Sequence, residues 1–325
     1  MAHKGKLIAR KAFGRFTYEA ASPPVIPQTI YDLASVTKVI ATTAACMLLY
    51  QRGELRLENP VRDVLPEFRD DDPRRNSITF RMLLAHSSGL PAYVKLFETS
   101  RTRDELLQQA YRVPLTHDPG SHAEYSDIGF ILLGEALERM TGMPLDPFCR
   151  QQIFFPLELE TMTFNPAAEL RKQIPPTEED KTFRHRVIQG EVNDENAWVM
   201  GGVAGHAGLF STAYDVALFA ECMLRGGVSL WDLHTVELFT RRERSPSDTS
   251  RALGWDTPSR PSQSGRYFSP RSYGHLGFTG TSLWIDPQHQ LSVTLLTNRT
   301  WPDRGSQAIK QVRPAFHNAV IEALK

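Results

Sequence analysis

Ser35 and Lys38 form the pair of residues in this chain whose types and spacing most directly suggest chemistry. They lie in a run whose apolar residues recur at helical spacing and which stops at Gly53. Residues three apart on a helix share a face, so the hydroxyl and the amine can touch. A serine hydroxyl needs an adjacent base, and burial can lower the pKa of a lysine enough to make it one. The spacing indicates nucleophilic catalysis, although Ser-x-x-Lys also arises roughly once by chance in a chain of this size.

Three other segments contain residues that could act with Ser35. Tyr125 stands where a turn enters a helix, so its phenol is either a proton relay in a cleft or a half-buried surface group. Residues 273–281 start a strand that contains glycines, which mark either close approach of a ligand or a bulge. Residues 201–211 are glycine-rich but lack the lysine of a phosphate-binding loop, so they predict a tight loop near the site.

Composition excludes several classes of protein. The 325 residues carry equal numbers of acidic and basic side chains, which gives no electrostatic reason to expect nucleic acid or an anionic membrane as a partner. The three cysteines, far apart in apolar stretches, predict buried free thiols rather than disulfides. Histidine and cysteine spacing indicates no metal site, and we expect no cofactor. Without a transmembrane run or an export signal, the chain as written predicts a cytoplasmic protein, and a truncated or misassigned N-terminus leaves a periplasmic or extracellular location as the alternative.

The pattern of elements predicts an α+β fold. Strand-like runs occur at both ends of the chain, and the hairpin at 273–298 is followed by a terminal helix with Pro314 as a kink. We expect that helix to pack through its apolar residues, namely Ile309, Val312, Phe316, Val320 and Leu324. Between the ends lie helical patterns at 79–86, 103–112, 127–140, 212 onward and 229–241, with loops at 165–197 and 242–272. The early strand-like runs are 6–14 and 15–19. No βαβ alternation is present, which argues against a doubly wound sheet.

Taken in order, these segments resemble the serine β-lactamase and penicillin-recognising hydrolase family, in the branch of class C β-lactamases, DD-peptidases and family VIII esterases. Ser-Val-Thr-Lys at 35–38 matches the first family element. Tyr-Ser-Asp at 125–127 matches the second, with Asp127 in place of asparagine. His-Leu-Gly at 275–277 stands in place of Lys-Thr-Gly. Supporting matches lie at 83–90, 205–212 and 278–281, and the resemblance covers nearly the whole chain.

The resemblance implies a β-lactamase/transpeptidase-like fold with two units. An antiparallel sheet built from both chain termini and flanked by helices would comprise residues 1–58 and 212–325. A mostly helical insertion would comprise residues 59–211, and the active site would lie in the cleft between them. Residues 194–196 and 201–211 are most similar to the cell-wall peptidase subgroup associated with muropeptide turnover.

The resemblance also implies roles for individual residues. Ser35 would attack a carbonyl, with Lys38 and Tyr125 moving its proton, and the N–H groups of Ser35 and Phe278 would form an oxyanion hole. The residues expected to bind substrate are Asp127, His275, Gly277 and Thr279. An ionised Asp127 would hold Lys38 in its charged form, so we expect Tyr125 to take more of the base role.

This chain lacks the lysine of the third family element, and that difference affects which substrate we expect. In the family that cation helps to hold a carboxylate, so its replacement by His275 favours esters or peptides over efficient penicillin hydrolysis. His275 either holds a carboxylate and titrates near pH 6.5, or packs at a strand end. The expected reaction is acyl-enzyme hydrolysis of a small ester, a β-lactam or a peptidoglycan peptide. The alternatives are a penicillin-binding sensor that acylates without turnover and a non-catalytic partner protein.

Overall fold

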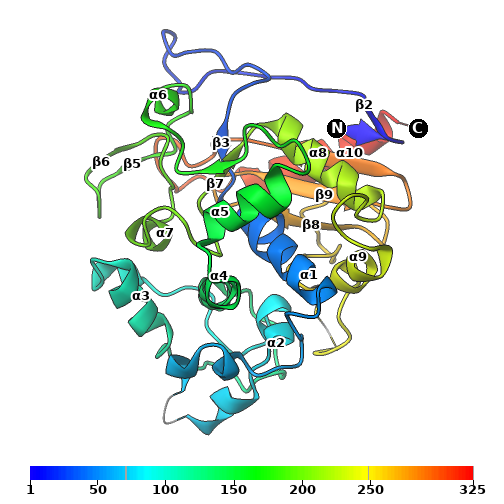
Figure 1. Cartoon of the computed structure of the whole chain (residues 1–325). Coiled ribbons are helices and arrows are strands. Elements are labelled where there is room, and N and C mark those ends of the chain that lie inside the picture. Colours follow the sequence, from blue (N-terminus) through cyan, green and yellow to red (C-terminus); the bar gives the residue numbers. More distant parts are fainter. Residues whose placement is uncertain (70–71, 248, 325) are drawn as a thin grey trace.

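The structure is a computed structural model that describes all residues except 70–71, 248 and 325. Its main sheet has five antiparallel strands in the order β2-β1-β10-β9-β8. Two of them come from the start of the chain and three from its end, which confirms the predicted sheet and fold class (Figure 1). The strands are β1 (Ala2–His3), β2 (Lys6–Leu7), β8 (Tyr273–Leu276), β9 (Ser282–Asp286) and β10 (Leu291–Leu295).

Helices account for most of the remaining described structure. They are α1 (Ala44–Gln51), α2 (Phe80–Leu84), α3 (Arg103–Ala110), α4 (Asp127–Thr141), α5 (Leu145–Cys149), α6 (Ala168–Arg171), α7 (Glu195–Val199), α8 (Ala213–Leu224), α9 (Leu233–Thr240) and α10 (Ile309–Glu322). The predicted helices at 79–86, 103–112, 127–140, 212 onward and 229–241 are thereby confirmed. The Thr212 hydroxyl accepts a hydrogen bond from the Asp215 N–H and caps α8, as its sequence predicts.

The first helical segment forms the centre of the molecule. It begins with a 3₁₀ turn at Ala34–Val36, continues as a π-helical stretch at Lys38–Thr43 and becomes regular in α1. Nearly all of its side chains are buried, because α4, α5 and α9 pack around it (Figure 1). A helix enclosed on all sides can hold a polar residue only where a specific partner meets it. Ser35 and Lys38 occupy the end of this helix that reaches the sheet.

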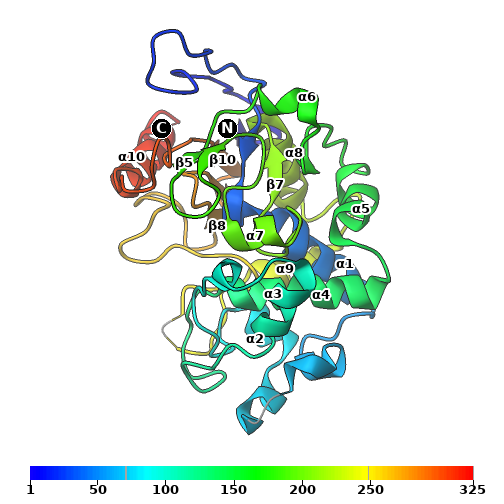
Figure 2. The same ribbon diagram turned by 90° about the vertical axis from the view of Figure 1, so that its left-hand side faces the viewer.

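Two helices cover the main sheet. Helix α8 contacts β9 and β10, and α10 packs over Trp284, Leu291 and Val293. The two chain termini lie near each other in both views (Figures 1 and 2). The buried residues of α10 are Ile309, Arg313, His317 and Ile321, and Val312 is half exposed. The predicted apolar face was therefore wrong in part, because two polar residues occupy the centre of the buried stripe.

Three further differences separate the structure from the predicted elements. Residues 15–19 form a loop with a single bridge from Arg15 to Pro24, and this N-terminal loop extends beyond the sheet (Figure 2). The predicted strand 273–285 is divided into β8 and β9 by a turn at 277–281. The predicted loop 165–197 contains α6, α7 and the hairpin of β5 (Glu178–Asp180) with β6 (Arg186–Ile188).

A small second sheet links the chain's segments around the first helix. Its strand order is β3-β7-β4, formed by β3 (Tyr31–Asp32), β7 (Leu209–Ser211) and β4 (Thr163–Phe164). This sheet brings the start of the Ser35 segment beside the glycine-rich loop 201–208. The division of the chain into units at residues 58 and 212 stays a prediction.

Two smaller expectations concern cysteines and membranes. Cys46, Cys149 and Cys222 are all free and buried, which confirms the predicted thiols. Within the described residues, no helix combines the length and the apolar character needed to cross a bilayer.

Candidate active site

The backbone in front of Ser35 is held in an uncommon conformation. Ala34 has φ = 47°, in the left-handed region that residues with a Cβ rarely adopt. The buried carboxylate of Asp32 stabilises this bend, since it accepts hydrogen bonds from the N–H of Ala34 at 2.8 Å and of Asn193 at 2.7 Å. The pKa of Asp32 is raised to about 6, because burial outweighs these hydrogen bonds. The bend directs Ser35 out of the helix start into the adjacent cavity, which it lines.

Lys38 is fully buried and contacts three oxygen atoms. Its Nζ lies 2.9 Å from Ser35 Oγ, 2.9 Å from the His206 carbonyl oxygen and 2.7 Å from Asp127 Oδ1. The spacing of Ser35 and Lys38 thus places the amine against the hydroxyl, as predicted. Three oxygen contacts satisfy the amine's hydrogen-bonding capacity and fix its position.

The electrostatics of Lys38 differ from the expectation. Burial lowers the pKa of Lys38 below its ordinary value, and this effect outweighs the attraction of Asp127, which acts in the opposite direction. Asp127 favours the charged form of the lysine, as expected, but burial has the larger effect on the pKa. Lowering the lysine pKa increases the fraction of neutral amine, which is the form that can take a proton.

Tyr125 is aimed at Ser35 by the residue that follows it. Ser126 caps α4 by accepting the Gly129 N–H at 3.1 Å, and its own N–H donates to His86 Nδ1 at 3.0 Å. The His86 ring lies against the Tyr125 ring at 4.7 Å between centroids, which identifies His86 as a structural residue of this site. In this position the Tyr125 hydroxyl donates to Ser35 Oγ at 2.8 Å.

Tyr125 is a neutral phenol in this environment. Burial, followed by the Asp127 charge, raises the pKa of Tyr125 well above its usual range. A phenol that holds its proton can donate it but is a poor base. These pKa directions favour Lys38 as the proton acceptor and Tyr125 as the donor, whereas the expectation gave Tyr125 more of the base role; which of the two is the base stays a prediction.

The turn at 277–281 is fastened to the segment that leads into Ser35. The Thr279 hydroxyl donates to the Asp32 carbonyl at 2.8 Å, and the Thr281 hydroxyl donates to the Leu33 carbonyl at 2.9 Å. Gly277 belongs to the cavity wall, and a Cβ there would lie 1.9 Å from Thr281 Oγ1. Thr279 was expected to bind substrate, but it is buried and its hydroxyl is used in this attachment, so that expectation is corrected.

Phe278 offers its backbone to the cavity. Its N–H makes no hydrogen bond within the described part of the chain, whereas its carbonyl accepts from Arg299 Nε at 2.6 Å. Arg299 also lies over the Phe278 ring at 4.2 Å, which holds the peptide group from the other side. A free N–H beside the nucleophile is the kind of donor that an oxyanion requires.

Arg313 of α10 supports the same turn from beneath. Its guanidinium donates to the carbonyls of Gly277 at 2.5 Å and Thr281 at 2.9 Å, inside the protein. Burial and then the neighbouring Arg299 lower the pKa of Arg313 to about 10. This role could not be predicted from the sequence, because Arg313 stands on a helix whose apolar residues suggested a different buried face.

His275 lies in the cavity wall but does not behave as a titrating cation. Its Nδ1–H donates to the Leu276 carbonyl at 2.8 Å, and its side chain is buried. Burial, followed by the charges of Lys38 and Arg251, lowers the pKa of His275 well below its usual value. The expectation of a charge change near pH 6.5 is therefore wrong, and His275 presents a neutral ring to the cavity.

Arg251 supplies a cation that the sequence analysis did not identify. Its guanidinium lies 5.4 Å from the centre of the Tyr125 ring and lines the same cavity as Ser35. The Asp256 carboxylate lies 3.6 Å from this guanidinium and positions it. Both residues belong to the segment 242–272, for which the sequence predicts only a loop. No local pattern could reveal this, because Arg251 and Tyr125 come together only through the fold.

Asp194 and His206 hold the carbonyl that contacts Lys38. His206 Nε2 lies 2.9 Å from Asp194 Oδ1, and the other function of Asp194 is to cap α7 through the Ala197 N–H at 2.8 Å. Burial would raise the pKa of Asp194, but His206, the Ala197 N–H and Lys38 together outweigh it and bring that pKa to about 2. The glycine-rich loop is thus a support for Lys38, in agreement with the tight loop predicted near the site.

The residues described above surround one cavity of about 590 Å³. Among the predicted residues, its wall includes Ser35, Tyr125, Asp127, His275, Gly277 and Phe278. Lys38 lies behind Ser35, and Thr279 lies outside the wall. The arrangement combines a nucleophile, a buried amine, a phenol and a free N–H, which are the groups that acyl transfer needs.

Comparison with known proteins agrees with this geometry. The family model described as "Beta-lactamase" matches residues 1–315. The chain belongs to the β-lactamase family. It is 36% identical over 332 aligned positions to an N-acetylmuramyl-L-alanine amidase of Bacillus subtilis, covering 91% of this chain and 75% of the relative. It is 38% identical over 304 positions to a putative D-alanyl-D-alanine carboxypeptidase of Salmonella agona, covering 83% of this chain and 69% of the relative.

Solved structures of this β-lactamase-family fold are similar over nearly the whole chain. An octameric penicillin-binding protein homologue from Pyrococcus abyssi superposes with a TM-score of 0.77 at 21% identity, over 99% of this chain and 72% of the other. A hydrolase with promiscuous acyltransferase activity superposes with a TM-score of 0.78 at 22% identity, over 97% and 92%. The family and its relatives identify the chain as a β-lactamase-related serine hydrolase.

Proposed function

We propose that this hydrolase cleaves an amide bond of a cell-wall peptide through an acyl-enzyme on Ser35, acting as a D-alanyl-D-alanine carboxypeptidase. The observation that carries the proposal is that Ser35 Oγ is contacted at once by Lys38 Nζ at 2.9 Å and Tyr125 Oη at 2.8 Å. A base and an acid on the same oxygen are what acylation of a serine by an amide requires.

Acylation follows from the positions of these groups. Neutral Lys38 takes the Ser35 hydroxyl proton as Oγ bonds to the substrate carbonyl carbon, and Asp127 at 2.7 Å stabilises the ammonium that forms. The N–H groups of Ser35 and Phe278 receive the oxyanion, each donor being worth about 10²–10³ in rate. Tyr125 gives its proton to the departing nitrogen as the C–N bond breaks, and Lys38 returns a proton to the phenolate. Water then attacks the ester with the same groups, which regenerates Ser35.

Arg251 supports a substrate that carries a carboxylate on its leaving group. A D-alanine leaving group bears a carboxylate next to the nitrogen that Tyr125 protonates, and Arg251 lies over the Tyr125 ring. Arginine binds carboxylates through paired N–H donors, so it can take the part of the family lysine that His275 replaces. An ester without a carboxylate would not need this contact.

A second candidate is hydrolysis of the amide between N-acetylmuramic acid and L-alanine. It is favoured by the amidase relative in Bacillus subtilis, which matches 91% of this chain. The acyl group would then be the lactyl ether of the sugar, and the leaving group would be a peptide whose first carboxyl is already in an amide. Arg251 would have no adjacent carboxylate to bind in that reaction.

Mass spectrometry of the products of a muramyl pentapeptide separates these reactions. The proposal predicts sustained loss of the terminal D-alanine, whereas an amidase would release the intact pentapeptide. A single stoichiometric acylation without further product would indicate a sensor, and no reaction would indicate a non-catalytic partner. Ser35→Ala should be inactive.

Arg251→Gln tests the substrate assignment. It should raise KM for the D-Ala-D-Ala peptide by about tenfold, the effect of one lost charged hydrogen bond, and leave KM for p-nitrophenyl butyrate unchanged. Because Arg251 also lowers the pKa of Lys38, both substrates must be compared over the pH range. An equal change in both KM values would contradict carboxylate binding by Arg251.

A further inference from the structure

A second cavity opens from the first on the side of Asp127. Its volume is about 700 Å³, and Lys95, Phe97 and Thr182 belong to the walls of both cavities. The segment that carries Lys95 and Phe97 is joined to the site by the Asp127 N–H, which donates to the Ala92 carbonyl at 2.9 Å. Arg251, in contrast, lies over Tyr125. The second cavity therefore extends the site through a wall that includes neither Tyr125 nor Arg251, the residues assigned to the leaving group.

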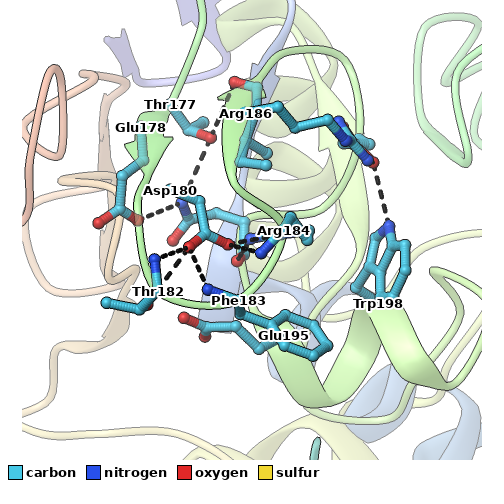
Figure 3. Close-up of polar contacts among 12 residues, drawn as sticks. Thr177, Glu178, Asp180, Thr182, Phe183, Arg184, Arg186, Glu195 and Trp198 are labelled. Atoms are coloured by element: carbon cyan, nitrogen blue, oxygen red, sulfur yellow. Dashed lines mark hydrogen bonds and ion pairs between the residues drawn. The ribbon is translucent and has the colours of Figure 1, made fainter. Parts of the chain in front are cut away.

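The floor of this cavity is a rigid turn between β5 and β6. The Asp180 carboxylate accepts hydrogen bonds from the N–H groups of Thr182, Phe183 and Arg184, at 2.9–3.0 Å (Figure 3). Arg184 also pairs with Asp180 at 3.0 Å and donates to the carbonyl of Val192. The guanidinium of Arg184 is thus fully used inside the protein and is closed to a ligand.

An aromatic wall stands beside this floor. The Phe97 and Phe183 rings lie 4.7 Å apart, and Phe183 meets the Trp198 ring edge-on at 5.5 Å. Trp198 is 38% exposed, and its Nε1–H donates to Glu191 at 3.0 Å, which fixes the indole (Figure 3). The segment opposite is fastened by Asn196, whose side chain accepts the Phe97 N–H at 2.9 Å and donates to the Val94 carbonyl. Such a preformed apolar wall is typical of a ligand subsite.

The charges of the cavity leave one cation without a carboxylate. Lys95 pairs with Glu98 at 3.0 Å, and Arg186 pairs with Glu191 at 2.7 Å. The Arg101 guanidinium instead donates to the carbonyls of Phe97 and Ser100, both at 3.3 Å, and forms no ion pair among the described residues; the Glu105 carboxylate accepts only the backbone N–H of Arg101, at 2.6 Å. The contacts of the guanidinium are long, so it retains donors for an acidic ligand.

We propose that this second cavity is a subsite for the acyl portion of an extended acidic peptide, with Arg101 binding a carboxylate of that portion and Trp198 packing on its backbone. The inference rests on the proposed function, because it assigns the cavity to the acyl side of the bond attacked by Ser35. An extended peptide advances about 3.3–3.6 Å per residue, so a group in the second cavity belongs to a residue that precedes the one attacked by Ser35.

Binding to the Ser35→Ala variant tests the subsite without turnover. The probes are two synthetic peptides, L-Ala-γ-D-Glu-L-Lys-D-Ala-D-Ala and its D-isoglutamine counterpart, which differ only in a carboxylate replaced by a carboxamide. Isothermal titration should give a Kd about tenfold lower for the glutamate peptide. In Ser35→Ala/Arg101→Gln the two peptides should bind alike, and Arg101→Lys should restore part of the preference. Trp198→Ala should weaken both peptides equally.

Controls separate this subsite from general effects. Arg150→Gln removes an exposed arginine beside a different cavity and should leave both Kd values unchanged. Melting temperatures of the Arg101 and Trp198 variants should match that of the parent. Equal binding of the two peptides to Ser35→Ala, or a preference that survives Arg101→Gln, would overturn the proposal. Turnover of diacetyl-L-Lys-D-Ala-D-Ala, which lacks the glutamate, tests the proposed function separately, so either one can fail alone.

Discussion

Replacing Asp127 by asparagine should move the acid limb of the activity profile to lower pH. Asp127 Oδ1 lies 2.7 Å from Lys38 Nζ, and the Asp127 charge raises the pKa of Lys38 against the effect of burial. At this separation and an effective dielectric constant of about 20, Coulomb's law gives roughly 6 kcal/mol. Relaxation of the site reduces this, and a neighbouring opposite charge shifts a pKa by about 1–3 units in proteins. We expect the limb to move down by about that amount.

The assay is kcat/KM for p-nitrophenyl butyrate between about pH 5 and pH 10, since this ratio reports pKa values of the free enzyme. The neutral ester avoids any change in the charge of the substrate. Asp118→Asn is the matched control, because it removes an exposed carboxylate that pairs with Arg74 on the protein surface. An acid limb that stays in place, or rises, in Asp127→Asn would refute Lys38 as the base.

Asp127→Asn should also lower the free energy of unfolding, and this effect should depend on pH. The pKa of Lys38 is lowered in the folded protein, so folding at neutral pH opposes protonation of a group that is charged in the unfolded chain. The penalty is complete below the folded pKa, shrinks as pH rises and disappears above the unfolded value of about 10.5. A further fall of the Lys38 pKa in Asp127→Asn enlarges this penalty wherever the wild-type lysine is still protonated. Its Tm deficit should therefore shrink as pH approaches that value.

Three other substitutions test the turn and the cavity wall. Gly277→Ala should lower kcat by about 10²–10³, because the new Cβ would displace the oxyanion donor. That Cβ would lie 1.9 Å from Thr281 Oγ1 and 2.5 Å from the Leu33 carbonyl oxygen. Wild-type KM and kcat in this variant would contradict the prediction. Arg313→Met should reduce the free energy of unfolding by about 1–3 kcal/mol in urea denaturation and lower kcat, since two buried carbonyls lose their donor. The pKa of His275 is lowered well below its usual value, so KM for a D-Ala-D-Ala peptide should not rise between about pH 6 and pH 8. A rise that is abolished in His275→Gln would show that His275 titrates in this range.

The parts of the site that depend on local spacing could be predicted from the sequence. Ser35 and Lys38 are three residues apart on one helix, so their contact follows from helical geometry alone. The position of Tyr125 at a helix start likewise follows from the capping residue beside it. The sheet could be predicted because strand patterns occur at both ends of the chain. The turn at 277–281 was missed because glycines inside a strand-like run can also mark a bulge.

The residues that sequence reasoning missed act across long separations. Arg251 meets Tyr125 only because the loop 242–272 folds over the cavity, and that loop has no periodicity. Arg313 occupies a buried stripe because the carbonyls of the turn accept its guanidinium, a partner that hydrophobic patterning cannot reveal. The pKa of His275 was misjudged for the same reason: burial and two nearby cations depend on the assembled fold.

Mass spectrometry after labelling with a fluorophosphonate probe tests the central claim that Ser35 is the nucleophile. The wild-type chain should gain one adduct, and peptide mapping should place it on Ser35. Lys38→Ala should label far more slowly, provided that its Tm shows it to be folded, because the hydroxyl loses the amine at 2.9 Å. Ser35→Ala should remain unlabelled with an unchanged Tm. An adduct on another serine, or full labelling of the Ser35→Ala variant, would contradict the account.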